Sequence, residues 1–156
     1  MAAAVVLSIN VAAVDEGDDD IIRTKGNGLA ATVTFYVARD GVVAEASTVA
    51  PLQENDVVRA RVTAQQRGHV AVVEVEASGR VDVLVPVDGA LQAVDVGETE
   101  LDGAGRLDAS TGAVDFVALL CRDAVAVDDD VRAAIAKDVA PAGCVLEHHR
   151  FNKMAR

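Results

Sequence analysis

The chain has 156 residues, of which 51% are hydrophobic and only 3% aromatic, and its net charge is −11. This length is typical of one domain that folds around its own core without metals, and the apolar content excludes a disordered protein. Because nucleic acid and anionic membrane surfaces bind proteins through clustered Lys and Arg, the acidity argues against both kinds of partner.

The N-terminal segment combines an apolar run with an acidic run. Residues 2–14 read AAAVVLSINVAAV, which is shorter than the roughly twenty residues that span a bilayer. No Lys or Arg precedes this run, unlike a secretory signal. It is open to three interpretations: a first strand, a soluble helix, or the end of a truncated membrane anchor. Residues 15–20, DEGDDD, predict a solvated linker, so we expect one β-rich domain over residues 21–156.

Alternating patterns after the linker predict strands. Residues 32–38 and 57–64 each place apolar residues on one face, and the second run places Arg59 and Arg61 on the other. Residues 70–77 and 80–87 flank Ser78-Gly79, which predicts a β-hairpin with Glu74 and Glu76 on one face of its first arm. Short strands joined by loops are expected over residues 88–111, and the apolar run 114–120 predicts a strand buried on both faces.

One helix is expected near residues 128–139. Three aspartates precede it, and Val127, Val131, Ile135 and Val139 form an apolar stripe. Pro141 and Gly143 end it, and residues 144–151 predict a last strand. The fold class is therefore mainly β: an antiparallel β-sandwich, or partly open barrel, with one α-helix.

Cys121 and Cys144 are predicted to lie at a strand end and a strand start on either side of this helix. If those ends meet, a disulfide would stabilise the fold by roughly 3 kcal/mol in an oxidising compartment. The alternative is two buried thiols that pack as small hydrophobic groups.

Metal ligands are the other candidate chemistry. Glu147 and His149 can share a strand face, with His69 as a third candidate ligand, whereas His148 points to the opposite face. These are weak zinc candidates, since a polar edge strand also explains the sequence. The acidic runs 15–20 and 128–130 do not have the spacing of a calcium-binding EF-hand loop, and a linker and a helix start explain them. We therefore expect no cofactor and no metal.

Five stretches together resemble a known family: IIRTKG (21–26), ENDVVRARVTA (54–64), HVAVVEVEASGRVDVLVPVDG (69–89), FVALLCRDAV (116–125) and APAGCVLEHHRFNK (140–153). The family comprises bacterial domains of unknown function, found as the extracytoplasmic C-terminal part of single-pass membrane proteins with anti-sigma-like, zinc-finger N-terminal segments. The resemblance implies a β-rich sensor or interaction domain in the periplasm or cell envelope. It also implies that the residues before Asp15 end a membrane tether.

No catalytic pattern emerges from the residues. The glycine-rich segments lack the Lys-Ser/Thr of a phosphate-binding loop, and no serine lies in a nucleophile-elbow motif. We therefore expect a non-enzymatic extracytoplasmic sensor or protein-interaction domain with an unidentified partner or ligand. The alternatives are a small-ligand or carbohydrate-binding β-sandwich, a hydrolase whose site is assembled only in the fold, and a cytoplasmic soluble location.

Overall fold

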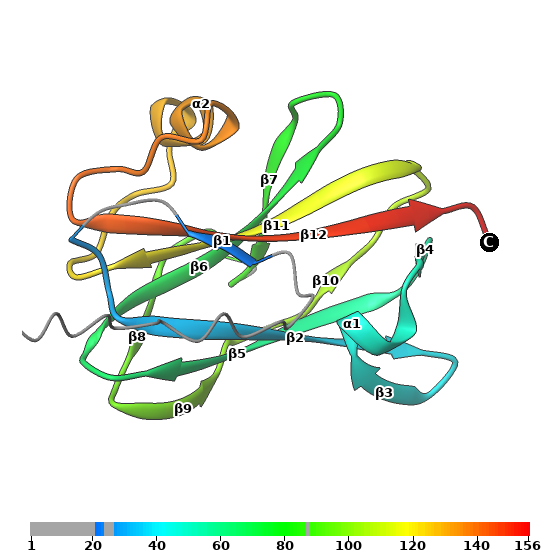
Figure 1. Ribbon diagram of the computed structural model, residues 1–156, viewed down its shortest axis with the longest axis horizontal. Coiled ribbons are helices and arrows are strands. Elements are labelled where there is room, and N and C mark those ends of the chain that lie inside the picture. The colour runs from blue at the N-terminus through cyan, green and yellow to red at the C-terminus, as the bar shows by residue number, and fades with distance from the viewer. Residues whose placement is uncertain (1–20, 24–26, 87) are drawn as a thin grey trace, which may run out of the picture.

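The computed structural model describes residues 21–23, 27–86 and 88–156, and these form two curled sheets arranged as a half-barrel (Figure 1). The apolar stub and the acidic linker expected over residues 1–20 lie outside the described residues. The larger sheet has the order β1-β12-β11-β6-β7, with β4 beside β12 and β8 beside β6. The smaller sheet has the order β10-β5-β2-β3, with β9 beside β5.

The larger sheet is mainly antiparallel, and only β4 runs parallel to its neighbour, β12. Its strands are β1 (Ile21–Arg23), β4 (Leu52–Gln53), β6 (Gly68–Glu76), β7 (Val81–Val85), β8 (Gln92–Val94), β11 (Gly112–Cys121) and β12 (Cys144–Met154). The smaller sheet contains β2 (Ala31–Arg39), β3 (Val42–Glu45), β5 (Val57–Ala64), β9 (Gly97–Glu100) and β10 (Gly105–Arg106).

The main core lies between the two sheets. Alternate residues of β2 and β5, such as Val37 and Val58, face alternate residues of β6 and β11, such as Val72. Phe35 and Phe116 are buried in this core with their rings 5.2 Å apart, and the partly buried Phe151 packs against Phe116 at 5.1 Å. The period-two pattern of valines therefore builds the predicted sheets.

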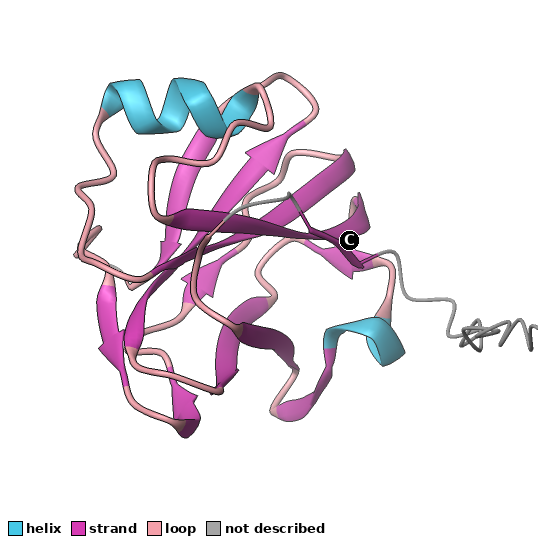
Figure 2. Cartoon of the chain, turned by 60° about the vertical axis from the view of Figure 1, so that its left-hand side comes forward, coloured by secondary structure: helices cyan, strands magenta, loops and turns pink. Residues whose placement is uncertain are grey.

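A second core lies on the opposite face of the larger sheet, beneath helix α2 (Asp129–Ala136). Figure 2 shows this helix lying across that face. Ile135 is its buried residue, and it packs with Val117 and Leu119 of β11. Strand β11 is therefore buried on both faces, which confirms the interpretation of its continuous apolar run.

The hairpin and the disulfide both form as predicted. Strands β6 and β7 pair through Val75↔Val81, with Gly79 at positive φ in the turn. Cys121 and Cys144 are directly paired on β11 and β12, and their sulfurs are bonded. The disulfide thus joins two neighbouring strands of the larger sheet.

Several expectations were wrong in detail. The helix ends at Ala136, because Asp138 adopts positive φ, and Val139 is 54% exposed instead of extending the stripe. A short helix α1 (Ala46–Val49) follows β3 and was not predicted. Strand β12 is no edge strand over residues 147–149, because β1 and β11 pair on its two sides.

The interior also contains polar side chains. The buried polar residues of the described chain are Asp56, Glu74, Glu147 and Lys153. Within the described ranges, no helix has the length and hydropathy needed to cross a membrane.

Candidate functional site

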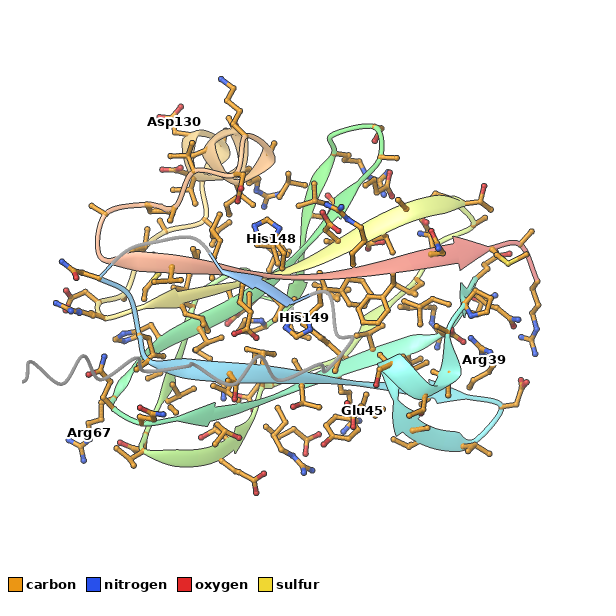
Figure 3. The ribbon with its side chains drawn as sticks, in the orientation of Figure 1. Arg39, Glu45, Arg67, Asp130, His148 and His149 are labelled. Carbon is orange, nitrogen blue, oxygen red and sulfur yellow. A yellow bond between two sulfur atoms is a disulfide. The ribbon has the colours of Figure 1, made fainter. Side chains whose placement is uncertain are left out.

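The sequence-predicted metal candidates separate into two places. Glu147 and His149 share the face toward the main core, as expected, and His149 Nε2 lies 2.8 Å from Glu147 Oε1. His69 lies elsewhere, beside the carbonyl of Arg122, and His148 contacts Asp138 on the side of α2. Figure 3 shows His148 and His149 on opposite sides of β12. No group of three metal-ligating side chains occurs among the described residues.

Glu147 instead connects the two sheets. It is 1% exposed, and its Oε1 accepts a hydrogen bond from the backbone N–H of Val33 at 3.0 Å. The ring of His149 meets the edge of Phe35 at a centroid distance of 4.8 Å. A buried carboxylate requires such partners, since an unpaired one would be strongly destabilising.

The other acidic candidates are accounted for by local structure. Asp128 is the N-cap of α2, and its Oδ1 accepts a hydrogen bond from the N–H of Val131 at 2.9 Å. Asp129 and Asp130 lie in the first turn, where the helix dipole favours negative charge. The run 15–20 lies outside the described residues.

A cluster of charges that the sequence did not predict closes one end of the main core. Lys153 is 3% exposed, and its Nζ donates to Asp108 Oδ1 at 2.6 Å and to Glu74 Oε1 at 3.4 Å. Ser110 Oγ also donates to Asp108 Oδ1, at 2.6 Å. We call Lys153, Glu74, Asp108, Ser110 and Arg80 the Lys153 cluster.

Arg80 extends the Lys153 cluster to the surface. Its guanidinium contacts Asp108 at 3.0 Å, Glu76 at 2.8 Å and Asp82 at 2.7 Å. A cavity of about 290 Å³ adjoins these residues between β7 and β10, and Glu74 and Arg106 line it too. Each of its described carboxylates is already engaged by a cation of the chain.

The two carboxylates that contact Lys153 titrate in opposite directions. Burial raises the pKa of Glu74, and the charge and hydrogen bond of Lys153 offset only part of this effect. Hydrogen bonds from Lys153 and Ser110 hold the pKa of Asp108 well below its ordinary value. Pairs of carboxylates with oppositely shifted pKa values occur in acid–base catalysis. Here Lys153 contacts both carboxylates, so we assign the Lys153 cluster a role in stabilising the fold.

The largest cavity described lies on the outer face of the smaller sheet, away from both cores. Its volume is about 670 Å³, within the range of small-ligand sites. The apolar side chains on this face are Ala38, Val43 and Val57 of strands β2, β3 and β5. Ala44 and Ala60 also line the cavity, but strand alternation puts them on the other face, and Ala60 is buried in the main core. We call this site the Tyr36 cavity, because Tyr36 is its aromatic residue.

Strand register brings the polar groups of the Tyr36 cavity together. Tyr36 pairs with Glu45 on one side and Arg59 on the other, and Arg61 pairs with Glu100. All five therefore project from the outer face.

One cation–π contact and one ion pair hold three of these side chains and Glu100 in place. The guanidinium carbon of Arg61 lies 5.0 Å from the centroid of the Tyr36 ring, which is a cation–π contact. Arg59 forms an ion pair with Glu100 at 3.1 Å. Arg61 has no carboxylate partner within the part of the chain that the structure describes. The cavity thus combines apolar walls, one aromatic ring, the cation of Arg61 and the carboxylate of Glu45, which accepts a hydrogen bond from Ser47 Oγ.

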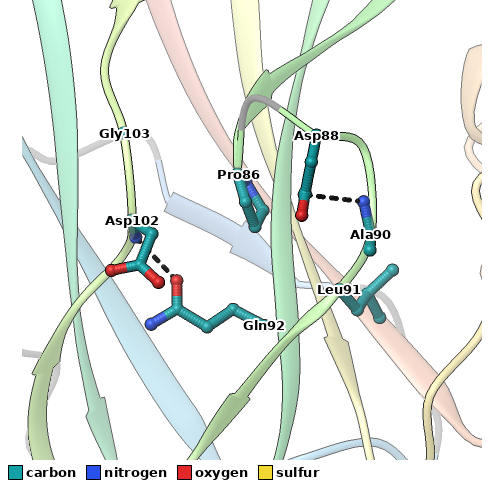
Figure 4. A pocket seen from close by; sticks show the side chains of 7 residues that line it. All are labelled: Pro86, Asp88, Ala90, Leu91, Gln92, Asp102 and Gly103. Carbon is teal, nitrogen blue, oxygen red and sulfur yellow. Dashed lines mark hydrogen bonds between the residues drawn. The ribbon is translucent and has the colours of Figure 1, made fainter.

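Two smaller cavities are weaker candidates for a ligand site. The one shown in Figure 4 has a volume of about 340 Å³, and its polar groups bond to its own loops: Asp88 accepts from the N–H of Ala90, and Gln92 from that of Asp102. The other, of about 280 Å³, contains the buried Asp56, which Arg39 holds through two hydrogen bonds of 2.8 and 2.7 Å.

Comparisons with protein-family models, with curated proteins and with solved structures find no match for this chain. The site is therefore argued from its own geometry. The signal for the Tyr36 cavity was present in the sequence, because the alternation put Arg59 and Arg61 on the polar face of their strand. The strand register that places Tyr36 between Arg59 and Glu45 could not be predicted from the sequence.

Proposed function

We propose that this chain is a non-enzymatic, extracytoplasmic sensor domain that binds its signal in the Tyr36 cavity. The observation that carries the proposal is the cavity itself, which has about 670 Å³, mainly apolar walls and a few convergent polar groups. Ligand sites of soluble proteins have this composition. The other described cavities are smaller.

The location outside the cytoplasm rests on the disulfide between Cys121 and Cys144. Disulfides persist in oxidising compartments and are rare in the cytosol. The resemblance to extracytoplasmic domains of membrane-associated regulatory proteins supports the same location. A tether through the residues before Asp15 belongs to this proposal.

A protein partner is the second candidate. Val42 and Val43 of the edge strand β3 are 68% and 64% exposed, and Val43 also lines the Tyr36 cavity. Tyr and Arg are the residue types that contribute most at the centres of protein interfaces. No specific observation favours the hydrolase alternative, because the described contacts of the three histidines include carboxylates and backbone but no serine.

The proposal is tested by filling the cavity. Ala38 and Thr32 both lie on the outer face of β2, but only Ala38 lines the cavity. We would compare Ala38→Trp with the matched control Thr32→Trp in thermal unfolding and native mass spectrometry, using small-molecule extracts of cells. Binding by the wild-type chain and by Thr32→Trp, with loss in Ala38→Trp, is expected. Equal binding by all three proteins would contradict the proposal.

A further inference from the structure

We infer that the Tyr36 cavity binds an elongated zwitterion, which is a ligand with a carboxylate at one end, an ammonium at the other and an apolar chain between them. This inference rests on the proposed function and specifies the chemistry of its ligand. The charged side chains that line the cavity are two cations and two anions, which are Arg59, Arg61, Glu45 and Glu100. Because these charges balance, the lining selects neither an anion nor a cation, and a ligand that carries both charges matches it best.

Two of these four charges form an ion pair, and the other two can contact a ligand. Arg59 and Glu100 compensate each other at 3.1 Å. Arg61 contacts the ring of Tyr36, and Glu45 accepts a hydrogen bond from a neighbouring serine hydroxyl at 3.1 Å, but neither forms an ion pair within the described ranges. A guanidinium has several N–H donors and a carboxylate several acceptor sites, so these contacts do not saturate either group. Arg61 can therefore hold the carboxylate of a ligand, and Glu45 its ammonium.

Strand register sets the spacing between Arg61 and Glu45. Strand β2 lies between β3 and β5, and Tyr36 of β2 pairs with Glu45 on one side and Arg59 on the other. Arg61 lies two residues beyond Arg59 on β5. Its Cα therefore stands two strand spacings across the sheet and two residues along it from the Cα of Glu45, which is about 12 Å. The two charges thus come from opposite sides of Tyr36, which favours a ligand whose own charges are well separated.

The apolar part of the lining lies in the next row of the sheet. Val43, Ala38 and Val57 pair across the three strands, and they adjoin the row that contains Glu45 and Tyr36. Val43 is 64% exposed, so this row leaves apolar surface in water. A methylene chain that lies on the row would remove both apolar surfaces from water, which favours binding. A zwitterion without such a chain would leave the row exposed. The cavity therefore suits an ω-amino carboxylate.

The experiment uses three probes with the same six-carbon chain, 6-aminohexanoate, hexanoate and hexylamine, and glycine as a zwitterion without the chain. The ¹⁵N-labelled full chain is titrated with each, and amide shifts around Tyr36 report the site and the affinity. We expect 6-aminohexanoate to bind about tenfold or more tightly than each other probe, because a second hydrogen bond between charged groups adds at least that factor. Arg61→Gln should reduce its affinity to that of hexylamine, and Glu45→Gln should reduce it to that of hexanoate.

Arg67→Gln is the matched control, because Arg67 is 86% exposed and pairs with Asp95 away from the cavity. It should bind every probe as the wild type does. If hexanoate, hexylamine or glycine binds around Tyr36 as tightly as 6-aminohexanoate, the ligand class is wrong while the cavity remains a ligand site. If no probe shifts these amides, the ligand class is wrong, and the comparison of Ala38→Trp with Thr32→Trp in cell extracts decides separately whether the proposed site is wrong too.

Discussion

Lys153 is a buried cation in an interior that is otherwise mainly apolar. A buried ammonium is tolerated only with close anionic partners, and Asp108 and Glu74 supply them. No local pattern predicts this pairing, because Asp108 and Glu74 are 45 and 79 residues from Lys153 along the chain. By contrast, the shared face of Glu147 and His149 followed directly from strand alternation.

Replacing Lys153 with methionine should lower the free energy of unfolding by about 3–5 kcal/mol, since Glu74 would lose its partner while remaining buried. Urea denaturation measures the change. Lys137→Met is the control, because Lys137 is exposed at the end of α2 and should change stability little. The double variant Lys153→Met/Glu74→Gln should regain part of the loss, and a double variant no more stable than Lys153→Met would argue against the assigned pairing.

Asp108 should make the fold sensitive to acid. Its pKa is held below the ordinary value of 3.8, so its contribution to stability is present above that pH and is lost as pH falls below it. Glu74 acts in the opposite sense, because a raised pKa favours the folded state at low pH and loses that effect as pH rises above 4.5.

We therefore expect Asp108→Asn to flatten the acid limb of the stability curve. Urea midpoints at about pH 6 and about pH 3 should differ less in the variant than in the wild type. Ser110→Ala, which removes one hydrogen bond to Asp108 but keeps its carboxylate, should retain most of the wild-type dependence. Equal pH dependence in the wild type and Asp108→Asn would contradict the assignment.

Helices and strands formed by residues close in the sequence were predictable, whereas the packing between distant elements was not. The hairpin β6–β7, helix α2 with its Asp128 cap, and the doubly buried β11 follow from local pattern and turn chemistry. Strands β3 and β4 and helix α1 are too short to show a recognisable hydrophobic periodicity in the sequence. The two close approaches at Gly28 and Gly105 depend on packing between distant segments.

Gly28 provides a test of that packing. A Cβ at Gly28 would overlap the backbone of Val145 and Leu120, whereas one at Gly105 would overlap only the side chain of Leu84. We expect Gly28→Ala to destabilise the protein by about 1–3 kcal/mol or more, and Gly105→Ala by less, because a leucine can change rotamer. Thermal unfolding of the two variants checks this order, and the reverse order would show that the β11–β12 end of the sheet is more deformable than described.

At the scale of the whole molecule, the fold covers the larger sheet on both faces but leaves the outer face of the smaller sheet open. Helix α2 covers the larger sheet with a second core, and the equivalent face around Tyr36 carries the largest described cavity. The second core and the proposed binding site thus lie on different sheets. Substitutions at the Tyr36 cavity should therefore change binding without changing the stability set by the larger sheet.

The disulfide links two neighbouring strands of the larger sheet, and its contribution to stability should depend on the redox state of the compartment. Replacing Cys121 and Cys144 with serine removes a cross-link between residues 23 apart, which should cost about 2–4 kcal/mol. Thermal unfolding should show a lower Tm for the double variant, and a reductant should lower the Tm of the wild type toward the same value but leave the variant unchanged. Alkylation of thiols in intact cells before lysis then tests location: protected cysteines are expected outside the cytoplasm, and quantitative labelling of both under native expression would contradict it.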